Sequence, residues 1–144
     1  MTDTTSQQIQ KLSLVISSGT FEKVHYALVM AAGAAAIGIP VTLFFTMSAC
    51  VTILEGDGWR QLPSEKEGLS AINRDRDFEA KGVASMDELI QSCAELGVSF
   101  LVCEMGLRGE GLEDIPTLEM LKVERTGVVT FLNDASPDGS IIYI

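Results

Sequence analysis

Three cysteines are the residues of this chain best suited to chemistry, and Cys103 has the most suggestive surroundings. It comes near the end of an apolar, β-branched run, residues 98–105, which is typical of a strand buried on both faces. Ligands of open parallel sheets bind at the carboxyl ends of the strands. The glycine-rich residues 106–111 follow, so we expect Cys103 at a surface edge beside flexible backbone. It is then either a reactive thiol or a small buried hydrophobic residue.

The residues just after Cys103 could help it to act as a nucleophile. Main-chain N–H groups in the turn that contains Met105 and Gly106 could stabilise a thiolate or bind a sulfur substrate. Arg108 is the nearest cation in sequence and could pair with an anionic sulfur species. The alternative for Arg108 is a surface ion pair with Glu110 or Glu113.

Composition limits the other chemistry that the chain can perform. An odd number of cysteines without a CxxC pair argues against a disulfide framework, and a single histidine leaves no zinc site of usual spacing. We expect no cofactor and no metal, and a reducing, cytoplasmic compartment. A net charge of −10 argues against nucleic acid or anionic membrane as a partner.

The length of 144 residues is that of one domain. Residues 1–10 are a polar tail without the features of a signal peptide, and residues 11–144 form the domain. The uncharged residues 24–54 resemble a membrane span in hydropathy. They divide, however, into a helix, a Gly-Ile-Pro stop and a β-rich run, so we expect no membrane insertion.

The chain opens as a βαβ unit. A strand over residues 11–17 leads through a turn at Gly19 into a helix from Phe21 to about Ile37, with Thr20 as its cap. The turn could hold an anion, although one glycine falls short of the known phosphate-binding patterns. His25 is expected to be a packed side chain.

A second strand, residues 41–47, precedes Cys50. Parallel strands end on one edge, so Cys50 and Cys103 share a site if their strands are neighbours; otherwise Cys50 packs into a short helix of its own. Residues 55–82 are charged and aperiodic, which predicts a lid, a binding loop or an insertion. Trp59 in this segment could cover a site or a neighbouring subunit.

A helix beginning at the capping box Ser85–Glu88 and stopped by Gly97 is the best-defined element. Cys93 lies on its apolar face, which indicates packing more than reactivity. Helical and strand rises place Cys93 and Cys103 about 14 Å apart along the sheet axis, beyond the reach of a disulfide.

The remaining residues predict a short strand or extended piece over 117–123, a helix or strand over 127–135, and a closing strand over 140–144.

Several of these segments together resemble the DsrE/DsrF-like family, especially its sulfur-oxidation-associated branch. They are Lys-Leu-Ser-Leu-Val-Ile-Ser-Ser-Gly before an alanine-rich helix, Val-Thr-Leu-Phe-Phe-Thr, Leu-Ile-Gln-Ser-Cys-Ala-Glu-Leu-Gly-Val, and Phe-Leu-Val-Cys-Glu-Met. The resemblance implies a single α/β domain with a mostly parallel sheet of about five strands and helices on both faces. It also implies a trimeric or hexameric homo-oligomer.

The resemblance further implies a cysteine that carries sulfane sulfur, as a persulfide or thiosulfonate, between TusA-like and rhodanese-like partner proteins. On that match Cys103 is the sulfur acceptor and Cys93 a second thiol. The chain departs from the family pattern at residues 47–50, where relatives often have a Phe-Trp-Gly run, and in the charged insert. Whether it acts as a sulfurtransferase enzyme is open. The competing hypotheses are a thiol redox protein and a non-catalytic oligomeric binding domain with structural cysteines.

Overall fold

A five-stranded parallel sheet forms the centre of the computed structural model, which describes residues 8–144. Of the predicted tail, residues 1–10, the first seven residues lie outside the described part of the chain. The strand order is β4-β3-β2-β1-β5, and every neighbouring pair is parallel. The strands are β1 (Leu12–Ile16), β2 (Val41–Phe45), β3 (Ser99–Cys103), β4 (Glu124–Thr126) and β5 (Ser140–Tyr143).

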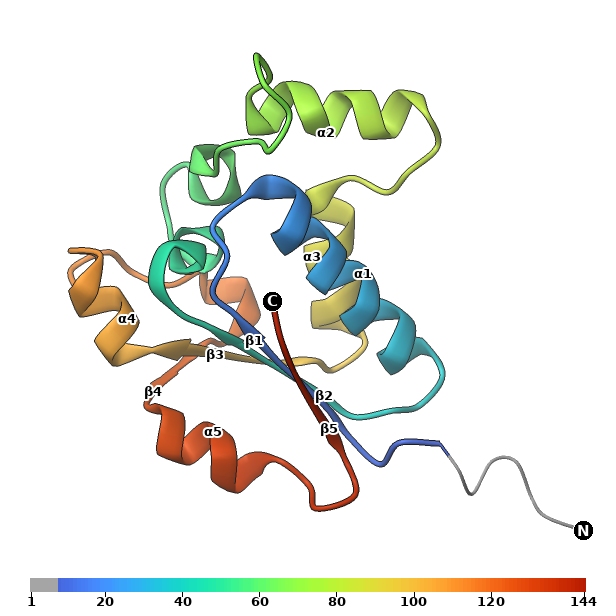
Figure 1. Cartoon of the computed structure of the whole chain (residues 1–144), viewed down its shortest axis with the longest axis vertical. Helices are drawn as coiled ribbons and strands as arrows, with labels where there is room; N and C mark the ends of the chain where they lie inside the picture. The colour runs from blue at the N-terminus through green and yellow to red at the C-terminus, as the bar shows by residue number, and fades with distance from the viewer. Residues whose placement is uncertain (1–7) are drawn as a thin grey trace, which may run out of the picture.

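Helices cover both faces of this sheet (Figure 1). Helices α1 (Phe21–Ala36) and α3 (Met86–Glu95) pack together on one face, and α5 (Val128–Asp134) lies across the other. Because all five strands are parallel, their carboxyl ends lie at one edge of the sheet. At this edge β2 leads into the 3₁₀ helix η2 (Met47–Ile53) and β3 into α4 (Glu104–Gly109). The predicted fold class is confirmed.

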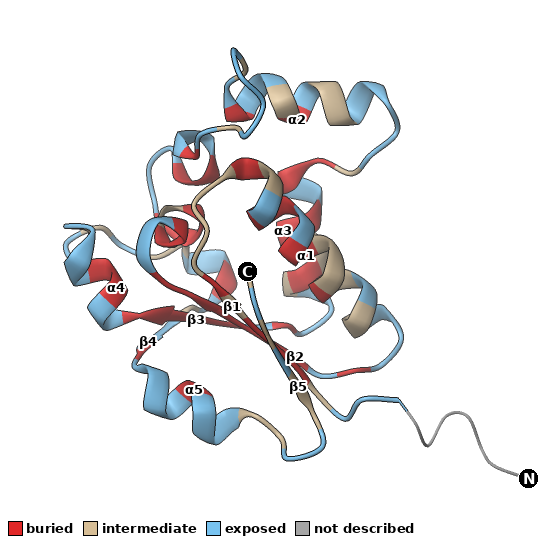
Figure 2. Cartoon of the chain, viewed as in Figure 1, coloured by how far each residue is buried: buried red, intermediate tan, exposed pale blue. Residues whose placement is uncertain are grey.

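The main hydrophobic core lies between the sheet and the α1–α3 layer. Because side chains alternate along a strand, Phe45 and Val102 face this core while Phe44 and Leu101 face α5. On the α5 side, Phe44 stacks on Phe131 with ring centroids 4.9 Å apart. Figure 2 shows the difference between the layers, since β2 and β3 are largely red and α5 is mostly pale blue. The α5 layer is thus the thinner cover of the sheet.

Residues 55–82 are not the aperiodic loop that the composition predicted. They contain the 3₁₀ helix η3 (Gly58–Gln61) and α2 (Ala71–Ala80), and Ser70 caps α2 by accepting a hydrogen bond from the Asn73 amide. Trp59 is buried against Phe21 and does not hang over a site. Its indole N–H donates to Asp87 at 2.8 Å. The segment is therefore folded onto the α1–α3 layer.

Two other local predictions were wrong. Residues 106–111 are not simply flexible, because most of them belong to α4. The strand or extended piece predicted over residues 117–123 contains instead the short 3₁₀ helix η4 (Glu119–Leu121). The strand in this part of the chain is β4, which begins just after that piece. Over the described residues no helix has the length and apolar character needed to cross a membrane.

Helix ends also differ from expectation in detail. Thr20 stands at the start of α1, but its hydroxyl donates to Glu65 instead of capping the helix. Ser85 does cap α3, accepting from the Glu88 amide at 3.2 Å, and Gly97 adopts a positive φ of 80° after the helix. His25 is buried among aromatic rings, with Nε2 2.8 Å from the Ala84 carbonyl oxygen.

Candidate functional site

The carboxyl end of β3 places Cys103 at the start of α4. In the parallel register Cys103 lies beside Thr126 of β4, and Val102 lies beside Phe45 of β2. The Cys103 Sγ accepts a hydrogen bond from the Gly106 amide at 3.3 Å, in the position of a helix cap. The Gly106 N–H group is thus directed at the Cys103 sulfur.

Gly106 is needed for a close approach between α4 and the end of β2. A Cβ built on Gly106 would lie 2.6 Å from the Met47 nitrogen and 3.1 Å from the Thr46 Cα, too close for any L side chain. Only a glycine lets α4 lie this near to η2, and the same residue donates the hydrogen bond to Cys103. Gly106, proposed as a substrate-binding residue, thus has a structural task as well.

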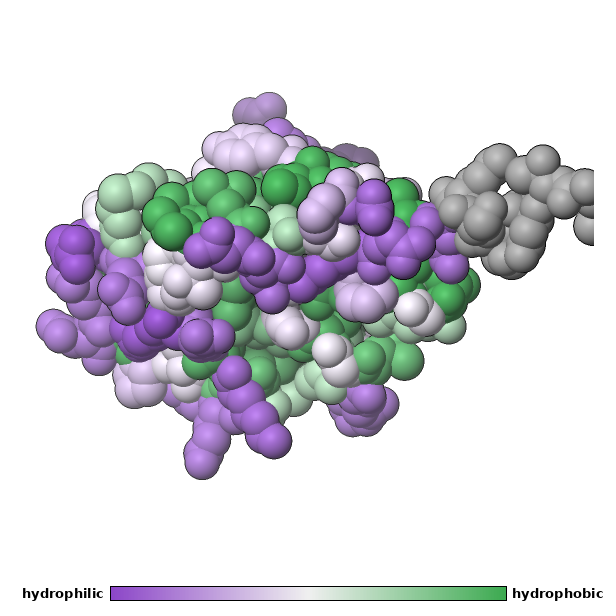
Figure 3. Space-filling view, turned by 90° about the horizontal axis from the view of Figure 1, so that it is seen from below, coloured by the Kyte–Doolittle hydropathy of each residue, from purple (hydrophilic) through white to green (hydrophobic). Residues whose placement is uncertain are grey.

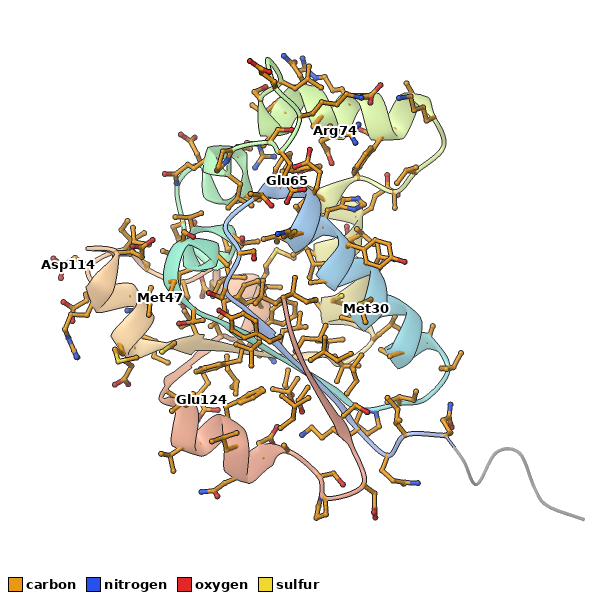
Figure 4. All side chains as sticks on the ribbon, in the orientation of Figure 1. Met30, Met47, Glu65, Arg74, Asp114 and Glu124 are labelled. Carbon is orange, nitrogen blue, oxygen red and sulfur yellow. The ribbon has the colours of Figure 1, made fainter. Side chains whose placement is uncertain are left out.

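Met47 completes this contact with an unusual backbone. Its φ of 51° is in the left-handed region, which a methionine rarely adopts. Figure 4 shows Met47 beside α4. Backbone strain of this kind persists where the surrounding structure imposes it, often at functional sites. The sequence marked Met47 only as part of residues 47–50, where the chain departs from the family pattern, and it did not mark Thr46.

Cys103 itself is buried, contrary to the expectation of an accessible thiol. Only 3% of the residue is exposed. Phe44, Leu101 and Phe131 pack with it on the α5 side of the sheet. The residues that follow are open to solvent, since Met105 is 61% exposed. The thiol therefore lies one layer beneath the surface, under the first turn of a short helix.

Cys50 lies in η2 and shares the neighbourhood of Cys103. Burial raises the pKa of Cys50 to about 12, and the negative charges of Cys103 and Glu110 act in the same direction. Cys50 therefore remains a neutral thiol at physiological pH. The two residues are close enough that a charge on Cys103 would oppose ionisation of Cys50.

Cys93 is in a different part of the molecule. It lies in α3 against α1, fully buried, and its S–H group donates to the Leu28 carbonyl at 3.7 Å. Burial alone raises the pKa of Cys93 to about 11. The three cysteines are all free, which agrees with the expectation that Cys93 and Cys103 form no disulfide.

Arg108 and Gly19 have internal partners. The Arg108 guanidinium is 3.3 Å from a Glu113 carboxylate oxygen, which is the surface ion pair considered as its alternative role. Gly19 packs on Ser48 of η2, where an added Cβ would lie 2.6 Å from the serine Cβ. Both Ser17 and Ser18 amides donate to the Ile144 carbonyl, so the donors that an anion would need are already used.

A cavity of about 220 Å³ opens next to this turn. Gly19, Ser48, Gln61 and Glu110 are among its lining residues. The Glu110 carboxylate disfavours an anion there. Cys103 does not line this cavity.

Nucleophilic attack by sulfur is the chemistry that the residues around Cys103 favour. Thiol exchange needs a thiolate and an approach path, and it needs no metal or general base once the thiolate is stabilised. The single histidine is engaged with Ala84, away from this edge. The protein is thus an α/β domain with a parallel sheet, in which a cysteine at the carboxyl edge caps the helix that follows.

The comparisons with known proteins give this class a family. The model of the DsrE/DsrF-like family matches residues 10–136, and the chain belongs to that family. The chain is similar to the sulfur carrier protein DsrE2 of Allochromatium vinosum, with 26% identity covering 94% of this chain and 98% of that protein. It is also similar to the protein YrkE of Bacillus subtilis, with 26% identity covering 94% and 97%.

A solved structure supports the fold. The ychN protein of E. coli superposes with a TM-score of 0.61, covering 94% of this chain and 100% of that one at 16% sequence identity. At that identity the likeness concerns the fold alone.

Proposed function

We propose that this protein is a sulfur carrier in which Cys103 holds sulfane sulfur. The observation that carries the proposal is the hydrogen bond from the Gly106 amide to the Cys103 Sγ at the head of α4. Membership of the DsrE/DsrF-like family and similarity to a protein named as a sulfur carrier support a role in sulfur relay.

The chemistry proposed is two successive displacements at sulfur. The Cys103 thiolate attacks the terminal sulfane sulfur of a donor persulfide; a new S–S bond forms, the donor S–S bond breaks, and the donor leaves as a thiolate. The thiolate of an acceptor then attacks that outer sulfur, and Cys103 leaves as a thiolate. Both steps conserve electrons, so no external oxidant is required.

Cys50 has a defined part in this scheme. A persulfide on Cys103 would be lost if a neighbouring thiolate attacked its inner sulfur, since that would form a disulfide and release hydrosulfide. Burial raises the pKa of Cys50 to about 12, which keeps this thiol protonated and unreactive. A neutral Cys50 would therefore protect the carried sulfur.

Access to Cys103 requires movement, because only 3% of the residue is exposed. Opening of the first turn of α4, a helix of 6 residues, together with movement of Phe131 would free the sulfur. We propose that sulfur exchange occurs from this opened form. TusA-like and rhodanese-like proteins are the proposed partners, in the cytoplasm, with the chain as a trimeric or hexameric homo-oligomer.

Intact-mass spectrometry after incubation with polysulfide or tetrathionate tests the function. We expect one adduct, about 32 Da for a persulfide or about 112 Da for a thiosulfonate, on Cys103. The variant Cys103→Ser should take up none, whereas the matched control Cys93→Ser should load as the unaltered protein does. Absence of any adduct would favour the non-catalytic binding domain. An intramolecular disulfide in place of an adduct would favour the redox protein.

A further inference from the structure

Two helices leave the sheet side by side at the Cys103 edge, and both expose apolar side chains there. Cys103 and Thr126 are register partners, so Met105 and Val128, each two residues further on, emerge from neighbouring strands. Such strands lie about 4.8 Å apart. With two further residues of α5 these form what we call the apolar collar: Met105, Val128, Val129 and Leu132, which are 61%, 49%, 68% and 54% exposed.

The α5 part of the collar is one continuous helix face. Residues 128, 129 and 132 are related by spacings of three and four, which places them together on a helix surface. Phe131, on the inner side of α5, packs against Cys103 in the small cluster. Figure 3 looks at the molecule from below, the side on which α5 lies, and shows green residues exposed among purple ones. Phe131 therefore links the helix that carries most of the collar to the buried thiol.

The chain between the two parts of the collar carries an excess of negative charge. The segment from residue 104 to residue 125 has six acidic against three basic residues, namely Glu104, Glu110, Glu113, Asp114, Glu119 and Glu124 against Arg108, Lys122 and Arg125. Arg108 is paired with Glu113, and Arg125 donates to the main-chain carbonyl groups of Glu113 and Ile115. Glu104 and Glu124 are exposed and take part in no ion pair within the described residues. Figure 4 shows Glu124 where the chain enters α5.

We propose that the apolar collar is the docking surface for the protein that exchanges sulfur with Cys103, and that this partner presents an apolar patch bordered by lysine or arginine. The inference rests on the proposed function. Exposed apolar side chains with a charged border are typical of protein interaction sites. The acidic border favours a basic partner and repels acidic ones.

The test compares transfer of sulfur to a protein with transfer to a small thiol. Cys103 is first loaded with polysulfide, and the rate of sulfur loss is measured with dithiothreitol and with a purified TusA-like carrier protein. For the variant Val129→Ser/Leu132→Ser, we expect transfer to the protein to slow at least about tenfold. Transfer to dithiothreitol should stay unchanged, which also shows that the fold is intact.

Ile37→Ser is the matched control, because Ile37 is 65% exposed and lies at the end of α1, at the opposite edge of the sheet. It should change neither rate. Glu104→Lys/Glu124→Lys should also slow transfer to the protein, and raising sodium chloride to about 0.5 M should slow transfer by the unaltered chain.

Three outcomes would overturn the proposal. Transfer to the carrier at the unaltered rate by Val129→Ser/Leu132→Ser would show that the collar is not the docking surface. A smaller particle for that variant in light scattering would show that a second copy of the chain occupies the collar. Failure of the unaltered chain to load sulfur on Cys103 would remove the proposed function and this inference together, and the loading step reports it separately.

Discussion

Cys93 and Cys103 are both buried, yet their sulfur atoms have opposite roles in hydrogen bonding. The Cys93 S–H donates to the Leu28 carbonyl, an arrangement that needs the proton to remain on sulfur. The Cys103 Sγ accepts from the Gly106 amide, an arrangement that persists and strengthens when the proton leaves. Burial alone therefore does not distinguish a structural cysteine from a candidate nucleophile. The direction of the hydrogen bond does.

The elements that cover the two thiols differ as well. Cys93 is enclosed by α3 and by α1, a helix of 16 residues, so its exposure requires separation of two packed helices. Cys103 caps α4, which has 6 residues and two glycines, and packs against Phe131 of α5, which has 7 residues. Local opening is easiest where few apolar contacts must be broken. The two regions thus predict different reactivities in the native state.

Native-state alkylation is the strongest way to break this comparison. We expect iodoacetamide to modify Cys103 at least about 100-fold faster than Cys93, which corresponds to a difference of about 3 kcal/mol in the free energy of opening. Peptide mapping over a time course measures both rates. Modification of Cys93 first would contradict the assignment of Cys103 as the accessible thiol.

The pair of glycines in α4 gives the next largest effect. For Gly106→Ala, the added Cβ would clash with the main chain of Met47 and displace α4, so sulfur loading should fall about tenfold or more. Gly109→Ala is the matched control, since its nearest neighbour is the Met47 Sδ at 3.9 Å, an ordinary contact. Equal loading by the two variants, measured by intact mass, would argue against the geometry described for α4.

The sequence was informative wherever local signals and burial agree. The apolar runs of β1, β2 and β3 and the capping box of α3 are strong patterns, and the structure contains each element. The length argument for one domain rests on size alone, and the structure is one α/β domain around a single sheet. The position of Cys103 at the end of β3 followed from the same reading.

The elements that were missed are those in which tertiary contacts override composition. Helix α2 is largely polar, and its docking depends on pairs such as Arg74 with Glu22 that lie far apart in sequence. Helix α4 has two glycines, which disfavour a helix, and it forms where Cys103 caps it and Gly106 fits against Met47. No sequence pattern reports that close approach, so the sequence left open whether Cys103 is buried or accessible.

Alkaline pH tests the neutral state of the two structural thiols. The folded-state pKa values of Cys50, about 12, and Cys93, about 11, lie above the ordinary value of 9.0, so the unfolded chain loses these protons first. Their contribution to stability is complete below about pH 9 and is lost as pH rises toward these values, with a slope up to about 1.4 kcal/mol per pH unit for each thiol. We expect the free energy of unfolding, measured by urea titration at several pH values above 9, to fall less steeply with pH in Cys50→Ala and in Cys93→Ala than in the unaltered chain. A slope unchanged in both variants would show that these thiols are not protected.

The smallest expected effect concerns the backbone at Met47, compared with the same conformation at Lys122. Both residues have a φ of 51°, a region that costs a side-chain-bearing residue about 1 kcal/mol or more and glycine almost nothing. Lys122 is exposed, so Lys122→Gly should raise the free energy of unfolding by about 0.5–1 kcal/mol.

Met47→Gly relieves the same strain but also removes the side chain that lies along α4, so its gain should be smaller or absent. Because α4 then loses part of its support, Cys103 should be alkylated faster in Met47→Gly than in the unaltered chain, and at an unchanged rate in Lys122→Gly. Urea titration gives the stabilities and peptide mapping gives the rates. Equal gains in stability with no change in the labelling of Cys103 would mean that Met47 does not support the cover over the thiol, and that the strain at this residue is unrelated to the site.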